Sequence, residues 1–97
     1  MKALGQNFLN SKVVAQDIVR AAKLMSSDTV LEIGPGKGFL TAGLLASSAR
    51  VVAVEKDDRM LSLFSDKFAL DIQIKKLSLI HGDIVELTEK NMLKLPT

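Results

Sequence analysis

The chain has 97 residues, of which 47% are hydrophobic and 25% are charged, and its formal net charge is +2. This balance fits one small globular domain with its own core, and it excludes a disordered chain. Because cysteine is absent, disulfides, a thiolate nucleophile and thiolate metal sites are excluded. Residues 1–12 lack the apolar block of a signal peptide, and no run approaches the roughly 18 apolar residues of a membrane span, so we expect a cytoplasmic protein.

The first part of the chain predicts a helix and a strand after a leader over residues 1–10. Ser11 is the expected N-cap of a helix that continues to about Leu24. The apolar stripe expected on the inner face of this helix is Val14, Ile18, Ala22 and Met25. A polar turn then leads to Thr29–Ile33, whose mostly apolar run is typical of a strand that is covered on both faces.

The remainder of the chain continues this alternation. The expected elements are a helix over Gly38–Ser47, a strand over Arg50–Glu55, a helix from Asp57 or Asp58 to about Phe68, a strand over Ser78–His81, and a loop or short helix within 84–97. The alternation predicts an α/β fold with three parallel strands joined by right-handed crossovers. Doubly wound sheets usually have about five or more strands, so we expect the amino-terminal half of such a fold.

The sequence Glu32-Ile33-Gly34-Pro35-Gly36-Lys37-Gly38 joins the first strand to the next helix. Glycine lets the backbone pass close to a ligand, and the helix that follows directs free N–H groups at the turn. The third glycine comes one residue earlier than in the Gly-x-Gly-x-x-Gly pattern of dinucleotide enzymes. Glu32 would repel a pyrophosphate and attract the sulfonium and amino groups of S-adenosylmethionine. The pattern favours this cofactor; the alternative is a tight turn without a ligand.

Two acids follow the later strands. Glu55 lies about twenty residues after the glycine turn, the spacing expected of a carboxylate that binds ribose hydroxyls. The alternative is a solvated acid at the end of the strand, or a partner for Lys56 or Arg59. Asp83 could accept a hydrogen bond from an adenine amine, and the alternative is a helix cap or a turn. We interpret His81 as structural and expect no metal, because no cysteine or second histidine is present.

Four segments of the chain together resemble the ribosomal RNA adenine dimethyltransferase family. They are Leu4–Leu9, Leu31–Thr41, Val54–Asp57 and His81–Asp83, and the similarity runs from about Lys2 to about Glu86. The Gly-Gln-Asn-Phe-Leu sequence in the first segment is far more specific than any glycine turn. The resemblance implies a Rossmann-like class I methyltransferase fold in which a leader helix lies over S-adenosylmethionine.

The resemblance also implies which residues bind the cofactor. Asn7 and Leu9 would contact it from the leader, Gly34 and Gly36 would line the turn, Glu55 would hold the ribose and Asp83 the adenine. The implied reaction is methyl transfer to the exocyclic amine of adenosines in ribosomal RNA. The implied partner of the full-length protein is ribosomal RNA within the small ribosomal subunit.

One part of the family's pattern is missing. Its catalytic motif is Asn, then Leu or Ile, Pro, and Tyr or Phe, and the ring stacks on an adenine turned out of the RNA. Lys94-Leu95-Pro96-Thr97 has lysine and threonine where the amide and the ring are required, so we reject it as this motif. The helical RNA-binding domain is missing as well. We therefore expect residues 1–97 to be an amino-terminal fragment that binds the cofactor at most weakly, holds no catalytic residue and is inactive by itself.

Three other functions stay open: a small-molecule methyltransferase, a dinucleotide-dependent oxidoreductase, and a non-catalytic RNA-binding or assembly module. The Gly-Gln-Asn-Phe-Leu sequence disfavours the first, and the glycine spacing with Glu32 disfavours the second. We expect no membrane partner. Without a fourth strand, Thr29–Ile33 would have an unpaired apolar edge, so we also expect either self-association through this edge or poor solubility.

Overall fold

The computed structural model describes residues 11–47 and 49–92. Its helices are α2 (Lys12–Ala22), α3 (Phe39–Ala46), α4 (Asp58–Lys67), α5 (Ala69–Gln73) and α6 (Ile84–Glu89), and its strands are β1 (Thr29–Ile33), β2 (Arg50–Glu55) and β3 (Leu77–His81). The expected alternation of helices and strands is confirmed. The sequence did not indicate α5 as a separate helix, and α6 is the short helix expected within 84–97.

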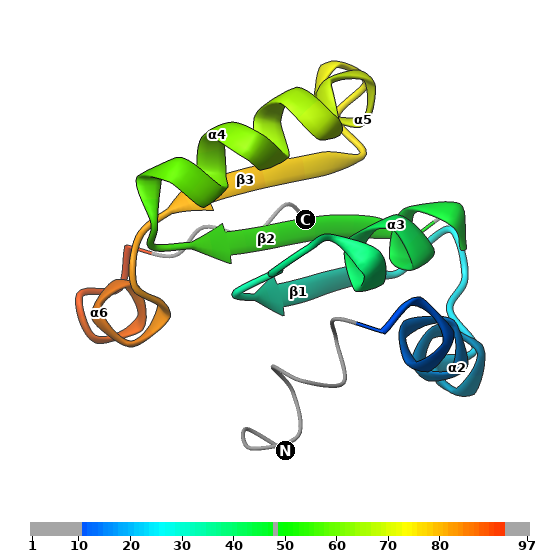
Figure 1. The fold of residues 1–97 in the computed structure, drawn as a ribbon. Helices are drawn as coiled ribbons and strands as arrows, with labels where there is room; N and C mark the ends of the chain where they lie inside the picture. The colour runs from blue at the N-terminus through cyan, green and yellow to red at the C-terminus, as the bar shows by residue number, and fades with distance from the viewer. Residues whose placement is uncertain (1–10, 48, 93–97) are drawn as a thin grey trace.

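The three strands form one parallel sheet in the order β1-β2-β3, as expected (Figure 1). Val30 of β1 lies beside Val51 of β2, which lies beside Leu77 of β3, so these three side chains share one face. β2 is the central strand, and all of its residues except the first are buried. The carboxyl ends of the strands meet at one edge of the sheet, where α6 also lies (Figure 1).

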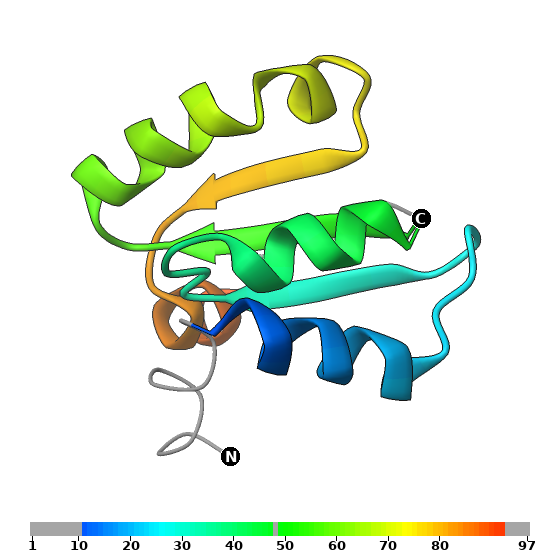
Figure 2. The ribbon, with the colours of Figure 1, turned by 45° about the vertical axis from the view of Figure 1, so that its right-hand side comes forward.

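Helices α2, α3, α4 and α5 lie on the same face of the sheet (Figure 2). Each right-handed crossover advances by one strand in the same direction, and this places both connecting segments on one face. The core forms between that face and the helices. Its buried residues are Leu44, Leu45, Val51, Ala53, Phe64, Phe68 and Leu77.

Two of the expected N-caps are confirmed by their hydrogen bonds. The Ser11 hydroxyl oxygen accepts from the Val14 N–H at the start of α2. The Asp57 carboxylate accepts from the N–H groups of Arg59 and Met60 at the start of α4. Each bond satisfies a backbone donor that has no partner within its own helix, so these side chains fix where the two helices begin.

The inner face of α2 differs from the expected stripe. Ala15 is fully buried and Val19 packs against the core, whereas Ile18 and Met25 are 39% and 65% exposed. The reason lies in α3, where a Cβ atom at Gly43 would come within 3.0 Å of the Val19 side chain. Small residues on both helices let them approach closely, and this contact decides which face of α2 turns inward.

The expectation that both faces of β1 are covered is wrong for the described residues. Helices α2 to α5 cover the face that carries Val30 and Glu32, while Leu31 and Ile33 on the other face are 38% and 53% exposed. A continuous apolar run does not show which face of the strand the helices cover. The direction of the crossovers decides which face that is. Within 11–47 and 49–92, no helix has the length and apolar character that crossing a membrane requires.

Candidate functional site

A cleft of about 510 Å³ opens at the carboxyl ends of the strands, the edge where ligands bind in open α/β sheets. It lies among the ends of β1, β2 and β3 and the first turns of α4 and α6. Its lining residues are Ile33, Gly34, Gly36, Val54, Glu55, Lys56, Asp57, Met60, Gly82, Asp83, Ile84 and Val85.

Four of the six residues predicted to bind the cofactor lie around this one cleft: Gly34, Gly36, Glu55 and Asp83. The other two, Asn7 and Leu9, lie outside the described residues. α2 packs against α3, and none of its residues lines the cleft, so the expectation that this helix lies over the bound cofactor is not met. The apolar lining residues were not predicted, although three of them, Ile33, Val54 and Ile84, directly neighbour predicted residues in the sequence.

The backbone of the glycine turn has a conformation that residues with a side chain rarely adopt. Gly34, Gly36 and Gly38 have φ values of 63°, 61° and 87°, in the left-handed region that favours glycine. The Gly34 N–H donates to the Val54 carbonyl at 2.9 Å, so the pairing of β1 with β2 continues into the turn. Nothing lies within 4 Å of the point where a Cβ atom on Gly34 would be. The turn therefore exposes bare backbone to the cleft.

Glu55 ends β2 and is only 8% exposed, so it is not the solvated acid of the alternative interpretation. Among the described residues it forms no ion pair with Lys56 or Arg59. Its Oε2 atom accepts a hydrogen bond from the Asp57 N–H at 2.9 Å. This bond holds the carboxylate at the floor of the cleft, where it can accept hydrogen bonds from a ligand.

Asp83 is the N-cap of α6, so the capping interpretation is confirmed. Its Oδ1 atom accepts from the N–H groups of Val85 at 2.9 Å and Glu86 at 3.3 Å. Both bonds use the same oxygen, and Oδ2 takes no part in either. A cap and a ligand contact are therefore compatible, because capping fixes the carboxylate at the rim of the cleft and leaves one oxygen for another donor.

Glu32 does not line the cleft, which corrects the expectation that its charge faces the cofactor. It lies under α3 and is 5% exposed. Its Oε1 atom accepts a hydrogen bond from the Thr41 hydroxyl at 2.5 Å, and its Oε2 atom has no partner among the described residues. Burial raises the pKa of the carboxyl from 4.5 to about 7, although the bond from Thr41 lowers it in part.

His81 connects β3 to the segment that begins α4. Its Nε2 atom lies 2.8 Å from Asp58 Oδ1 and 3.3 Å from the Lys56 carbonyl oxygen. Both neighbours are acceptors, so Nε2 carries the proton in this arrangement. The contacts link the segment after Glu55 to the strand before Asp83, in agreement with the structural role expected for this histidine.

The chemistry of the lining suits an uncharged or cationic ligand better than an anionic one. Glu55, Asp57 and Asp83 contribute carboxylates and Lys56 contributes one cation, while much of the remaining lining is apolar or glycine backbone. Carboxylates accept hydrogen bonds from hydroxyl and amine groups and repel phosphates. Among the described residues, the carboxylates of this lining can accept hydrogen bonds from a ligand and so position it.

Comparison with known proteins gives a consistent result. A family model described as ribosomal RNA adenine dimethylase matches residues 1–94. The chain is 41% identical over 92 residues to a ribosomal RNA small subunit methyltransferase A of Dehalococcoides mccartyi, covering 95% of the chain and 31% of that protein. It is 42% identical over 85 residues to the dimethyladenosine transferase of Schizosaccharomyces pombe, covering 88% of the chain and 28% of that protein.

Similarity in structure points the same way. The crystal structure of the 23S rRNA methyltransferase ErmE superposes with a TM-score of 0.72 at 25% sequence identity, over 92% of this chain and 33% of that one. The expected α/β fold with three parallel strands is thereby confirmed. The chain spans about a third of the length of the curated relatives that it matches.

Proposed function

This chain belongs to the ribosomal RNA adenine dimethylase family, and we propose that it forms the cofactor-binding part of an enzyme that methylates adenosines in ribosomal RNA. The single observation that supports this proposal most is the cleft, which brings Gly34, Gly36, Glu55 and Asp83 together from three strand ends. The two glycines, Glu55 and Asp83 come from three separate stretches of the sequence, and the resemblance assigns all four residues to one ligand.

The proposed ligand is S-adenosylmethionine, which when bound supplies a methyl group made electrophilic by the sulfonium. Glu55 would accept hydrogen bonds from the ribose hydroxyls, and Oδ2 of Asp83 would accept one from the adenine amine. The bare backbone at Gly34 and Gly36 would let the cofactor approach the turn closely. By resemblance, Asn7 and Leu9 would add contacts from the leader.

The proposed substrate is an adenosine amine in the RNA of the small ribosomal subunit. The relatives reported whose names specify the small subunit are 39–42% identical to the chain, whereas the structure named for 23S RNA is 25% identical. That residues 1–97 are inactive by themselves belongs to this proposal, because the family's Asn-Leu/Ile-Pro-Tyr/Phe motif is not found in them. A cytoplasmic location belongs to the same proposal.

We expect Glu55→Ala and Asp83→Ala each to weaken binding of S-adenosylmethionine by roughly ten-fold or more, because hydrogen bonds to charged groups contribute about 1.5–3 kcal/mol. The measurement is calorimetric titration of the 97-residue chain. Asp83→Asn preserves the cap of α6, since asparagine is as good an N-cap as aspartate, but it removes the charge. Asp66→Ala, an exposed acid on α4, is the matched control and should bind as the wild type does.

The proposal fails if the wild-type chain does not bind S-adenosylmethionine or if both alanine variants bind it unchanged. Binding of a nicotinamide dinucleotide instead would indicate an oxidoreductase. Salt-dependent binding of RNA without cofactor binding would indicate a non-catalytic RNA-binding module. A parent enzyme that methylates small molecules but no RNA would contradict the proposed substrate.

We also propose that copies of the chain associate through β1. Within the described residues β1 pairs only with β2, so the backbone groups along its other edge have no strand beside them. Leu31 and Ile33 next to this edge are partly exposed, and β1 has none of the lysine or proline residues that protect natural edge strands.

We expect light scattering to show a mass that rises with concentration, and Leu31→Lys to suppress that rise. A wild-type chain that stays monomeric at high concentration would contradict this.

A further inference from the structure

Within residues 11–47 and 49–92, one side-chain hydrogen bond reaches the glycine turn from a distant helix. Lys67, in the last turn of α4, donates from Nζ to the carbonyl oxygen of Lys37 at 3.0 Å. The other described bonds of the turn are made by its backbone. The Gly34 N–H donates to the Val54 carbonyl, the Gly38 N–H donates to the Pro35 carbonyl at 3.1 Å, and the Gly38 carbonyl accepts from the Ala42 N–H at 2.9 Å. Lys67 therefore joins the carboxyl end of α4 to the tip of the turn that lines the cleft.

The position of the Lys67 ammonium is defined on several sides. It lies 5.5 Å from the centre of the Phe68 ring and 5.9 Å from that of the Phe39 ring, within the range of cation–π attraction. A Cβ atom at Gly38 would come 3.2 Å from the Phe68 ring and 3.4 Å from the Lys67 ammonium. The absence of a side chain at Gly38 thus makes the space in which the ammonium reaches the turn.

The charge of Lys67 is badly placed for the stability of α3. A cation near the first turn of a helix is opposed by the positive end of the helix dipole, and α3 has no side-chain cap to offset this. The Lys37 carbonyl and the rings of Phe39 and Phe68 offset this repulsion, because each of them attracts the ammonium. A turn of glycines is also costly to order, because glycine has the most backbone freedom to lose. A contact that holds the turn in its binding conformation before the ligand arrives improves affinity.

We infer that Lys67 is a positioning residue for the cofactor site, which pre-orders the glycine turn by holding the Lys37 carbonyl from α4. This inference rests on the proposed function, since the turn is taken to contact the cofactor. What matters for this role is that the Lys67 side chain is long enough for its ammonium to donate to the Lys37 carbonyl. Lys67 itself is not among the residues that line the cleft. Lys67 therefore acts through the backbone of the turn.

The test compares the wild-type 97-residue chain with two variants by calorimetric titration with S-adenosylmethionine. Lys67→Met keeps the length and apolar stem but loses the donor, and we expect its dissociation constant to rise about fivefold, as for one lost hydrogen bond. Lys67→Arg keeps a donor and a cation and should bind within about twofold of the wild type. All three should unfold at similar temperatures, because Lys67 is exposed.

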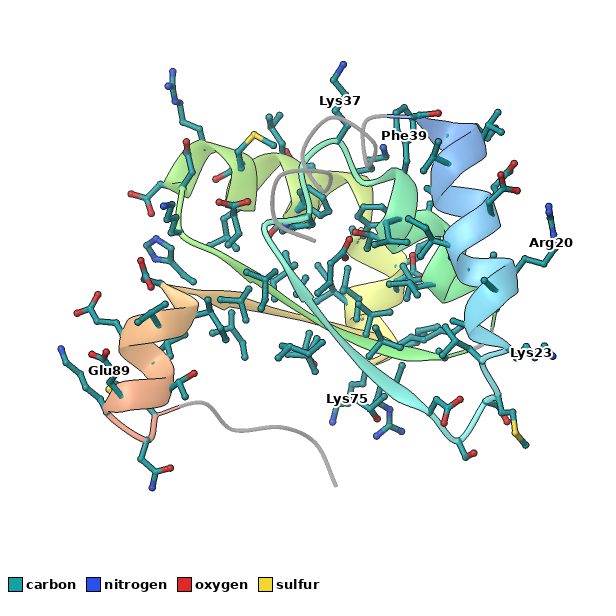
Figure 3. All side chains as sticks on the ribbon, turned by 90° about the horizontal axis from the view of Figure 1, so that it is seen from below. Arg20, Lys23, Lys37, Phe39, Lys75 and Glu89 are labelled. Atoms are coloured by element: carbon teal, nitrogen blue, oxygen red, sulfur yellow. The ribbon has the colours of Figure 1, made fainter. Side chains whose placement is uncertain are left out.

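Lys37→Met is the matched control for charge. It removes one positive charge from the same turn, but the bond from Lys67 uses the backbone carbonyl of Lys37, and its side chain points away from the molecule (Figure 3). We expect it to bind as the wild type does. If it weakens binding as much as Lys67→Met, the effect is one of charge and the inference is overturned. Unchanged binding by Lys67→Met overturns it as well.

Amide hydrogen exchange of Gly38 in the cofactor-free chain gives a second readout that does not depend on the proposed function. We expect exchange to be several-fold faster in Lys67→Met than in the wild type or in Lys67→Arg, because the turn opens more often. Equal exchange rates in the wild type and both variants would show that Lys67 does not order the turn. A wild-type chain that binds no cofactor overturns the proposed function, and the exchange rates then decide whether the contact orders the turn.

Discussion

Replacing Glu32 with glutamine is expected to raise the free energy of unfolding by about 3 kcal/mol at pH 8, because the pKa difference of the buried carboxyl corresponds to about that much. Glu32 is 5% exposed, and burial raises its pKa from 4.5 to about 7. At pH 8 the folded protein therefore has to bury a charge, and among the described residues its one hydrogen-bond partner is the Thr41 hydroxyl. Glutamine has nearly the same shape and can accept the same bond without a charge.

The sign of this effect depends on pH. A carboxyl whose pKa is higher in the folded protein stabilises the fold when protonated, so its contribution is complete below about pH 4.5 and is lost as the pH rises to about 7. The wild type and Glu32→Gln should therefore differ little at pH 4, diverge between pH 4.5 and 7, and differ by a constant amount above that. Urea denaturation at several pH values measures the difference directly.

A matched control is available on α6. Glu89→Gln changes the same chemical group at an exposed position (Figure 3) and should alter the free energy of unfolding by less than about 0.5 kcal/mol at any pH. A difference between the wild type and Glu32→Gln that is the same at pH 4 and pH 8 would show that the carboxyl does not titrate in this range. A destabilised Glu32→Gln at pH 8 would show that its charge has a partner.

Phe64→Ala is expected to lower the free energy of unfolding by about 4 kcal/mol, which is typical for removing a buried aromatic ring. Phe64 is 3% exposed in the core between α4 and the sheet, and its ring centre lies 5.4 Å from that of Phe68. Domains of this size have a total stability of roughly 5–15 kcal/mol, so one such loss leaves the chain close to unfolding. Circular dichroism during urea denaturation measures it.

Leu63→Ala is the matched control for Phe64→Ala. Leu63 is the preceding residue on the same helix but is 62% exposed, so its truncation should change the free energy of unfolding by less than about 0.5 kcal/mol. Phe64→Leu keeps most of the apolar volume and should lose less than Phe64→Ala. Equal losses at positions 63 and 64 would contradict the packing of α4 described above.

Features set by neighbouring residues were predictable from the sequence. β2 was predicted with its observed bounds, Arg50–Glu55, because an uninterrupted apolar strand between a turn and a helix cap has few other conformations. Ser11 and Asp57 fixed the starts of α2 and α4 through bonds to residues at most three positions away. Four of the predicted site residues meet at one cleft because parallel strands bring their carboxyl ends together.

The sequence by itself thus determined the strands, the caps, the order of the elements and the edge at which the cleft forms, since each depends on local backbone preferences and on the handedness of crossovers. Only the tertiary structure decided which face of α2 turns inward, because that depends on Gly43 across the helix contact. It also decided that Glu32 lies under Thr41 instead of facing the cleft, and that Lys67 reaches the carbonyl of Lys37, thirty positions away. Such contacts join residues that are distant in the chain, so they follow from how the elements pack and not from the local sequence around each residue.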